Sequence, residues 1–263
     1  MIAGFTAEEV LHEALVRPRD ARVALAGTQI IRRPGWSQVI TPAFRQGGLN
    51  SVDLAQLDPD EADAVIDATI AEYDALGLRF RWNVTPDSRP ADLAARLERR
   101  GLVGERVLVM AAALGRIHIE APAAVTVEEV DAASVRCFGE VTAAGWGMDP
   151  SPLIAHHRAL LAEPAGRDHH AFIARVAGEP AGAANYVVFE RSAHLMGAVV
   201  LPAWRHRGAY LALVAARLAH AAARGVRLVT TQARASTSAP IAARLGFVTV
   251  AEARSYSRHI PPT

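Results

Sequence analysis

Segments with helical periodicity alternate along the chain with short runs of apolar and β-branched residues, which are typical of strands. In the second half, a strand pair is predicted after residue 247, preceded by strands over 125–130, 169–176, 183–189, 194–201 and 227–233. The helices predicted there cover 132–144, 152–162, 208–224 and 239–245. In the first half, strands are predicted over 21–27, 37–44, 80–84 and 107–114, and helices over 6–16, 59–76 and 91–101. The order predicts the α/β (α+β) fold class with a mixed sheet.

A domain junction is predicted where the sequence ALGRIHIEAPAA has no helical periodicity and contains Pro122. It divides the chain into residues 1–117 and residues 123–263. The two halves share a faint pattern, because residues 80–102 and 227–247 both run strand, polar turn, proline, Ala- and Leu-rich helix, glycine and apolar residue. Such units are common, so the pattern indicates either coincidence or two diverged copies of one module.

The segment WRHRGAYLALVAARL, residues 204–218, gathers positive or potentially positive side chains around one glycine, just before a helical pattern. A helix start exposes unpaired backbone N–H groups and the positive end of the helix dipole. A glycine-containing loop that enters a helix is therefore suited to bind an anion such as a phosphate. Gly208 lets the chain approach such a ligand closely, and positive charge comes from Arg205, His206 and Arg207.

The helix after this loop is predicted to be amphipathic, with Gly225 as its C-terminal cap. One face, which we expect to pack on the sheet, carries Leu211, Val214, Leu218 and Ala222. A different face carries Arg217, His220 and Arg224.

From about Val125 to Arg258, a hairpin is followed by a strand ending in VVLPAWRHRG, a helix, a strand and a short helix ending in RLGF. This order resembles the GCN5-related N-acetyltransferase (GNAT) family, whose acyl-CoA-binding loop has the pattern Q/RxxGxG/A. Arg205 fits the first position and Gly208 the first glycine. Tyr210 stands where the family has Gly or Ala, and this departure weakens the motif.

The resemblance implies a mixed, mostly antiparallel GNAT-type sheet flanked by helices, with two such modules in tandem. Residues 123–263 would form a catalytic N-acetyltransferase domain, and residues 1–117 a degenerate GNAT-like domain or an unrelated accessory domain. Acetyl-CoA is the implied co-substrate. Its acyl and pantetheine groups would bind along a splayed strand, and its diphosphate would bind at the helix start. The implied cofactor-binding residues are therefore Val199, Val200, Leu201, Arg205, His206, Arg207, Gly208, Ala209 and Tyr210.

Acyl transfer from a thioester to an amine needs a neutral amine and a proton for the leaving thiolate. GNAT enzymes often supply this proton from a tyrosine four residues before the glycine of the LGF-type segment, but here that position is Ala242. Tyr256 is the candidate acid, Glu140 the candidate base and Trp146 a candidate wall of the acceptor site. Alternative acids or proton relays are Tyr210, Ser236 and Ser238. Alternative bases are Glu190, His156, His157, His169 and His170.

The implied reaction is transfer of an acetyl group from acetyl-CoA to a primary amine by direct attack, without a covalent enzyme intermediate. The acceptor would be a small molecule or a peptide. A function of another class stays open, namely an acyl-CoA-binding or sensing protein without catalysis. The residues at positions 242 and 210 both permit this alternative.

Composition adds limits to these expectations. A formal net charge of +1 gives no overall attraction to nucleic acid or to an anionic membrane, so neither partner is expected. The single cysteine, Cys137, cannot form an internal disulfide, and the acidic start of the chain does not resemble a secretory signal, so a cytoplasmic protein is predicted. No His, Cys, Asp and Glu residues have zinc spacing, and no metal is expected. A homodimer stays open.

Overall fold

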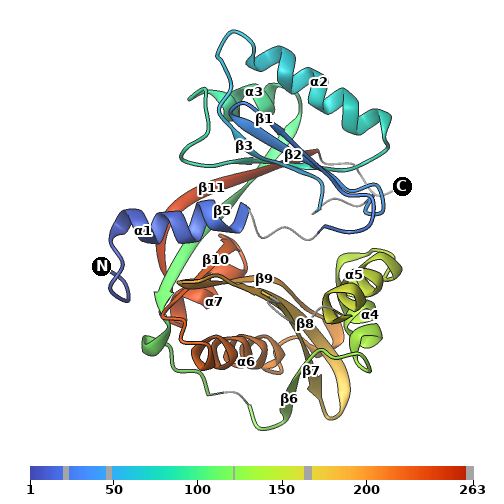
Figure 1. Ribbon diagram of the computed structural model, residues 1–263, viewed down its shortest axis with the longest axis vertical. Helices are drawn as coiled ribbons and strands as arrows, with labels where there is room; N and C mark the ends of the chain where they lie inside the picture. Colours follow the sequence, from blue (N-terminus) through green and yellow to red (C-terminus); the bar gives the residue numbers. More distant parts are fainter. Residues whose placement is uncertain (20–23, 46–48, 121, 163–167, 259–263) are drawn as a thin grey trace. The chain divides into compact units, whose positions relative to one another are not determined.

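The computed structural model describes residues 1–19, 24–45, 49–120, 122–162 and 168–258 (Figure 1). The chain forms two compact units. Unit 1 consists of Met1–Arg22, Val109–Ala233 and Thr237–Val250, and unit 2 of Val23–Leu108, Arg234–Ser236 and Ala251–Thr263. Two long strands, β5 (Leu102–Ala113) and β11 (Val248–Arg258), contribute residues to both units. The compact units are therefore interleaved in the sequence.

The sheet of unit 1 has the strand order β5-β10-β9-β8-β7-β6. Its strands besides β5 are β6 (Val125–Glu129), β7 (His169–Val176), β8 (Glu179–Val188), β9 (Ser192–Val200) and β10 (Leu228–Arg234). Neighbours from β6 to β9 pair antiparallel, whereas β10 pairs with β9 in parallel. A parallel pair needs a crossover connection, which helix α6 (Ala209–Ala223) supplies.

Helices cover both faces of this sheet. Helix α6 packs on β6 to β9, and α4 (Val135–Trp146) packs on β7 to β9 and on α5 (Ser151–Ala162). The side chains of β7 alternate between these layers, because Phe172 contacts His220 of α6 while Ile173 lies in a core cluster with Phe138 of α4. The remaining helical segments of this part of the chain are η3 (Leu114–Arg116), η4 (Pro202–Trp204) and α7 (Ser238–Arg244).

The N-terminal helical segment belongs to unit 1. Helix α1 (Ala7–Leu11) continues into the π-helical η1 (His12–Val16) and the 3-10 helix η2 (Arg17–Arg19). Thr6 caps α1 through a capping box, since the Glu9 N–H donates to Thr6 Oγ1 and the Thr6 N–H donates to Glu9 Oε2. The segment is held by a core cluster of Phe5, Val10, Ala111 and Leu228.

Unit 2 has the strand order β1-β2-β3-β4-β11. Its own strands are β1 (Gln29–Arg33), β2 (Trp36–Ile40), β3 (Ser51–Ala55) and β4 (Arg81–Val84), and its helices are α2 (Ala62–Ala75) and α3 (Leu93–Arg99). Strands β3 and β4 pair in parallel, and the neighbouring pairs β1–β2, β2–β3 and β4–β11 are antiparallel. The core gathers fully buried side chains that include Ile66, Tyr73, Trp82, Leu97 and Tyr256.

The two units repeat one order of elements. In unit 2, the hairpin β1–β2 is followed by β3, helix α2, the parallel strand β4 and helix α3. In unit 1, the hairpin β7–β8 is followed by β9, helix α6, the parallel strand β10 and helix α7. Residues 80–102 and 227–247, which share a sequence pattern, contain the equivalent parts β4–α3 and β10–α7. This repeated order agrees with two modules in tandem.

The predicted fold class is confirmed, with a mixed sheet flanked by helices. The predicted strand pair after residue 247 is wrong, because Val248–Arg258 contains no Gly or Pro to turn the chain and forms the single strand β11. The predicted junction between residues 117 and 123 lies inside unit 1. The division into domains of residues 1–117 and 123–263 concerns modules of the sequence and stays a prediction.

Gly104 of β5 provides a test of packing in unit 2. A Cβ atom at this position would lie 2.7 Å from Cε1 of the Tyr256 ring, which is too close for van der Waals contact. We expect Gly104→Ala to lower the free energy of unfolding by about 1–3 kcal/mol, as measured by urea denaturation. Gly115→Ala is the control, because a Cβ atom there meets nothing within 4 Å. Equal losses from both substitutions would contradict this packing.

Candidate active site

The parallel pair β9–β10 stops pairing before either strand ends. The last register pair is Leu195↔Thr231, whereas β9 continues to Val200 and β10 to Arg234. Beyond that pair, β9 passes through Gly197, which has a φ of +61°, and the register between β8 and β9 shifts nearby. A bulge of this kind bends a strand. Among the described residues, the part of β9 after Leu195 therefore has a β10-facing edge without strand pairing.

Backbone groups of Val200 face this unpaired edge. The Leu201 N–H donates to the Ala181 carbonyl at 2.9 Å, next to β8. Because successive residues of a strand turn their N–H and C=O groups to opposite edges, those of Val200 point away from β8. The side chains of Val199 and Leu201 pack instead against the core cluster beneath α4. Of the three expected strand residues, Val200 thus offers backbone groups and the other two anchor the strand.

The start of α6 follows directly, after η4 and the loop 205–208. Gly208 is the N-cap, with a φ of +85°, and has no side chain to cap the helix. The first helical hydrogen bond runs from the Ala212 N–H to the Gly208 carbonyl at 3.0 Å. The N–H groups of Ala209, Tyr210 and Leu211 precede this bond. The helix start therefore presents backbone donors together with the positive end of the helix dipole.

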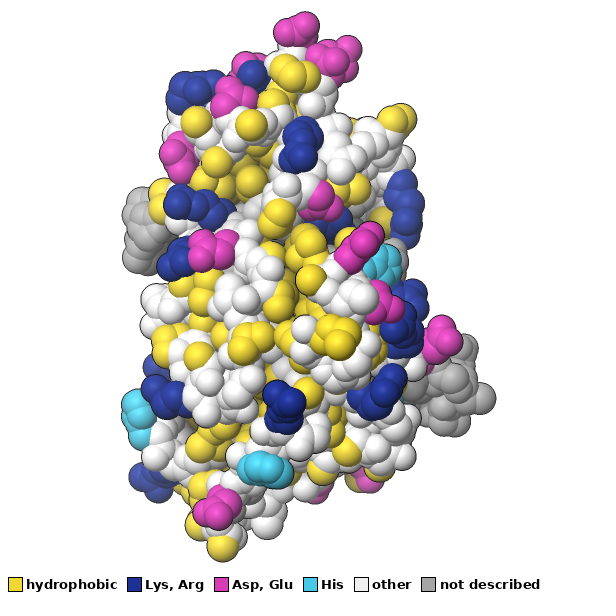
Figure 2. Space-filling view, turned by 90° about the vertical axis from the view of Figure 1, so that its left-hand side faces the viewer, with side chains coloured by type: hydrophobic (Ala, Val, Ile, Leu, Met, Phe, Trp, Pro, Cys, Tyr) yellow, Lys and Arg dark blue, Asp and Glu magenta, His cyan; other side chains and the backbone are white. Residues whose placement is uncertain are grey.

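Positive charge gathers beside these donors. Arg205, His206 and Arg207 are exposed, and the Arg207 guanidinium lies over the Trp204 ring at 5.2 Å. On the face drawn in Figure 2, basic and acidic side chains are interspersed among hydrophobic ones. With a formal net charge of only +1 for the whole chain, the cationic loop is a local feature. It suits an anion with several negative oxygens.

Gly208 is required at the helix start for two reasons. Its φ of +85° lies in the region that residues with a Cβ atom rarely adopt. A Cβ atom there would also overlap Cγ of Pro122, in the segment that leads into β6. The segment before β6 thus packs on the loop that enters α6.

Arg217 corrects the expected faces of α6. It is only 1% exposed, and its Nε donates to the Leu213 carbonyl at 3.0 Å. Its Nη1 donates to the Asn185 carbonyl on β8 at 3.0 Å and lies 3.5 Å from the Met196 carbonyl on β9. Burial lowers the pKa of Arg217 to about 10. The guanidinium therefore ties α6 to the two strands where β9 bends.

The prediction that Leu211 and Ala222 mark the packed face of α6 is wrong. The buried residues of the helix are Ala209, Ala212, Leu213, Val214, Arg217, Leu218 and Ala221. Positions 213, 217 and 221 recur every four residues, so the packed stripe runs through Arg217. Arg217 was predicted to lie on a different face of the helix from the apolar residues, so the sequence did not reveal its place in this stripe.

Trp146 and Asn185 flank the bulge of β9. A Cβ atom at Gly197 would lie 3.6 Å from Cη2 of Trp146 and 2.8 Å from Nδ2 of Asn185. Trp146 ends α4 and is 39% exposed. The Oδ1 atom of Asn185 is buried and has no hydrogen-bond partner among the described residues. The expected acceptor-site residue Trp146 thus lies beside the bend of β9, with a polar side chain that the sequence did not single out.

The two candidate catalytic residues lie in different units. Glu140 is exposed on α4, and its Oε1 is 3.9 Å from Nη1 of Arg136. Tyr256 is buried in unit 2, where its hydroxyl donates to Glu98 Oε1 at 3.0 Å and burial raises its pKa. Ala242, at the usual position of the acid, is buried in α7. The roles of Glu140 and Tyr256 stay predictions.

Comparison with known proteins gives the same family as the sequence motifs. Residues 110–231 match the family model described as an acetyltransferase (GNAT) domain. No curated protein sequence matches the chain. In the described parts of the chain, no helix combines the length and apolar character needed to cross a membrane.

Three solved structures share the fold. A GCN5-related N-acetyltransferase from Kribbella flavida has a TM-score of 0.66 at 18% identity, covering 98% of this chain and 97% of that one. One from Sphaerobacter thermophilus has a TM-score of 0.60 at 18% identity, covering 87% and 81%. A tandem GNAT protein from the clavulanic acid biosynthesis pathway has a TM-score of 0.55 at 15% identity, covering 100% and 98%. At these identities the likeness concerns the fold.

His194 makes the paired part of β9 sensitive to pH. Its side chain is buried, its Nδ1 lies 2.9 Å from Thr230 Oγ1, and burial lowers its pKa from 6.5 to about 4. The unfolded chain takes up a proton near pH 6.5 and the folded chain only near pH 4, so stability falls as the pH drops through this range. Between pH 7.5 and pH 5, wild type should lose about 2 kcal/mol more than His194→Asn. Urea denaturation measures this difference, and parallel pH profiles would contradict it.

Proposed function

We propose that this chain transfers an acetyl group from acetyl-CoA to a primary amine of a small molecule or a peptide, because residues 110–231 match the GNAT acetyltransferase domain model. The observation that carries this proposal is the unpaired edge of β9 next to the cationic start of α6, which has no side-chain cap at Gly208. In acetyl-CoA, the long pantetheine arm of the thioester needs an unpaired strand edge, and the diphosphate that follows it needs a cationic helix start.

The diphosphate would bind the N–H groups at the start of α6, with Arg205, His206 and Arg207 adding charge. Ala209 and Tyr210 contribute backbone donors, and the helix dipole favours the anion. The pantetheine amides and the acyl carbonyl would pair with the edge that Val200 exposes. The reacting carbonyl would then lie near the bend of β9, beside Trp146 and Asn185.

In the proposed reaction, the amine nitrogen attacks the thioester carbonyl carbon, the C–S bond breaks and the CoA thiolate leaves. The proton lost by the amine balances the proton gained by the thiolate. Asn185 Oδ1 can accept a hydrogen bond from the amine and orient it, whereas Glu140 remains the candidate base and Tyr256 the candidate acid. Burial raises the pKa of Cys137, which disfavours a thiolate nucleophile. Direct attack therefore fits better than an acyl-enzyme.

A non-catalytic acyl-CoA-binding protein is the second candidate function. It is favoured by Ala242, which leaves α7 without the usual proton donor. The two candidates differ in turnover. Release of free CoA in the presence of a panel of amines supports transfer, whereas binding of acetyl-CoA without release supports sensing. The chain contains no lysine, so acetylation of the protein itself gives little background in such an assay.

The helix start is tested by calorimetric titration with acetyl-CoA. We expect Gly208→Ala to weaken binding at least about tenfold, because it disturbs several backbone donors to a charged group. Arg207→Ala should weaken it only about threefold, because an exposed charge contributes little. S-acetylpantetheine, which lacks the diphosphate, should bind far more weakly than acetyl-CoA.

Gly178→Ala is the matched control for Gly208→Ala. Gly178 has a φ of +84° in the β7–β8 turn, and a Cβ atom there meets nothing within 4 Å. This substitution imposes the same backbone strain away from the helix start and should leave the affinity unchanged. Equal losses for Gly178→Ala and Gly208→Ala, or equal binding of acetyl-CoA and S-acetylpantetheine, would overturn the proposed diphosphate site.

Trp146 is tested with whichever amine of the panel turns over. Trp146→Ala should raise the KM for the amine about tenfold, because it removes an aromatic contact from the acceptor side, with the KM for acetyl-CoA nearly unchanged. Val103→Ala changes another exposed apolar side chain, on β5, and should change neither constant. A rise of both constants together would show that Trp146 supports the fold of the site rather than the acceptor.

A further inference from the structure

A cluster of titratable side chains lies between the sheet of unit 1 and α6. The Glu129 carboxylate, at the end of β6, contacts two imidazoles. Its Oε1 is 2.7 Å from Nδ1 of His170 on β7, and its Oε2 is 3.2 Å from Nε2 of His220 on α6. The two rings meet edge to face with centroids 4.4 Å apart. The other ring nitrogen of His220, Nδ1, hydrogen-bonds the Tyr186 hydroxyl on β8.

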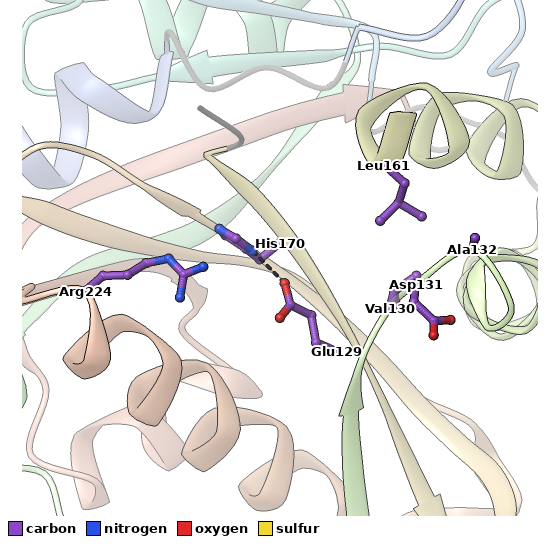
Figure 3. A pocket seen from close by; sticks show the side chains of 7 residues that line it. All are labelled: Glu129, Val130, Asp131, Ala132, Leu161, His170 and Arg224. Atoms are coloured by element: carbon purple, nitrogen blue, oxygen red, sulfur yellow. Dashed lines mark hydrogen bonds and ion pairs between the residues drawn. The ribbon is translucent and has the colours of Figure 1, made fainter. Parts of the chain in front are cut away.

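This cluster borders a hollow of about 460 Å³ that is lined by Glu129, Val130, Asp131, Ala132, Leu161, His170 and Arg224. Figure 3 shows the Glu129 carboxylate directed at His170, with the Arg224 side chain extending from the C-terminal end of α6. The His170 side chain is 3% exposed, His220 17% and Glu129 34%. The carboxylate thus connects two sheltered imidazoles with a hollow large enough for a small ligand.

We propose that Glu129, His170 and His220 bind a divalent transition-metal ion of the Zn²⁺ class. One ligand atom from each of the three residues lies within 4.8 Å of the other two. Zinc holds nitrogen and oxygen ligands at about 2.0–2.2 Å in a tetrahedron. The three atoms would have to move toward one common point to reach that spacing, and the hollow lined by Glu129 and His170 leaves room for a fourth ligand. Two imidazoles and a carboxylate are a donor set that suits zinc and its neighbours.

Tyr186 is placed to orient His220 as a ligand. Its hydroxyl hydrogen-bonds Nδ1 of His220, while Nε2 of the same ring faces the Glu129 carboxylate. With a metal on Nε2, Nδ1 would carry the proton and donate it to the Tyr186 hydroxyl oxygen. Such an outer contact fixes the ring orientation of a metal-binding histidine.

The charges around the hollow determine which kind of ligand would take the fourth coordination position of the metal. Arg224 lines the same space, and its positive charge by itself opposes a cation. Asp131, also in the lining, offsets part of this charge. A metal with one carboxylate and two neutral imidazoles keeps a net positive charge, so an anion bound to the metal beside Arg224 would be favoured. We assign the fourth position to hydroxide or to a small carboxylate or phosphate.

The experiment uses the full chain, freed of metals by a chelator. We expect Zn²⁺ to bind with one equivalent and to raise the melting temperature, and Co²⁺ to give the visible d–d bands of a tetrahedral site. Glu129→Gln and His220→Ala should each weaken binding at least about 100-fold, and Tyr186→Phe about tenfold, as expected for removal of an outer contact. Added phosphate should shift the Co²⁺ spectrum in wild type and shift it less in Arg224→Ala.

His169→Ala is the matched control. His169 is the neighbour of His170 on β7 but faces the other side of the sheet, toward His156 of α5. Its substitution should leave the metal affinity within about twofold of wild type, as expected for a residue outside the ligand set. Absence of binding tighter than about 100 µM, or binding that survives both Glu129→Gln and His220→Ala, would show that the cluster is only a hydrogen-bonded network. If His220→Ala fails to fold, Glu129→Gln and Tyr186→Phe, which keep the side-chain shapes, decide the question.

Discussion

The bend of β9 is the constraint from which the candidate active site follows. The strand must stay paired with β8 while it leaves β10, and glycines on both strands make this possible. At Gly182 of β8, a Cβ atom would lie 2.7 Å from the Val199 carbonyl, and Gly197 of β9 takes a φ of +61°. Arg217 then donates to the Asn185 carbonyl beside the bend. Among the described residues, the partners of this buried guanidinium are backbone carbonyls. Burial of a charge is costly, so these contacts make the bent strand and α6 mutually dependent.

Unit 2 has the same order of elements as unit 1 but a different charge at the start of the corresponding helix. Its parallel pair β3–β4 and helix α2 repeat the arrangement of β9, β10 and α6. The segment that enters α2 carries Asp58, Asp60 and Glu61, and Asp58 Oδ1 accepts a hydrogen bond from the Asp60 N–H. Carboxylates thus occupy the place that arginines hold before α6, and a phosphate would be repelled there. Under the proposed function, the charge at the two helix starts therefore favours unit 1 over unit 2 for the diphosphate of acyl-CoA.

Local signals predicted most of the described elements and the glycine at the start of α6. The strand over residues 169–176 matches β7 without change, and the helical segment predicted over 6–16 begins at α1 after its N-cap Thr6. Gly208 sits at the N-cap of α6, and Gly225 follows its C-terminal end. These features depend on residues a few positions apart, where backbone preference and periodicity act directly. The confirmed GNAT resemblance rests on the same short-range order.

The sequence did not predict features that depend on residues far apart in the chain. Glu129, His170 and His220 are separated by 41 and 50 positions (170 − 129 and 220 − 170) and come from three elements. No spacing rule for metal ligands covers such a set, because the sheet pairing and the rotation of α6 bring it together. The orientation of α6 also buries Arg217, which was predicted on the same face as His220 and Arg224. Because the predicted orientation of α6 was wrong, the sequence revealed neither the support that Arg217 gives to the bent strand nor the position of His220 beside Glu129.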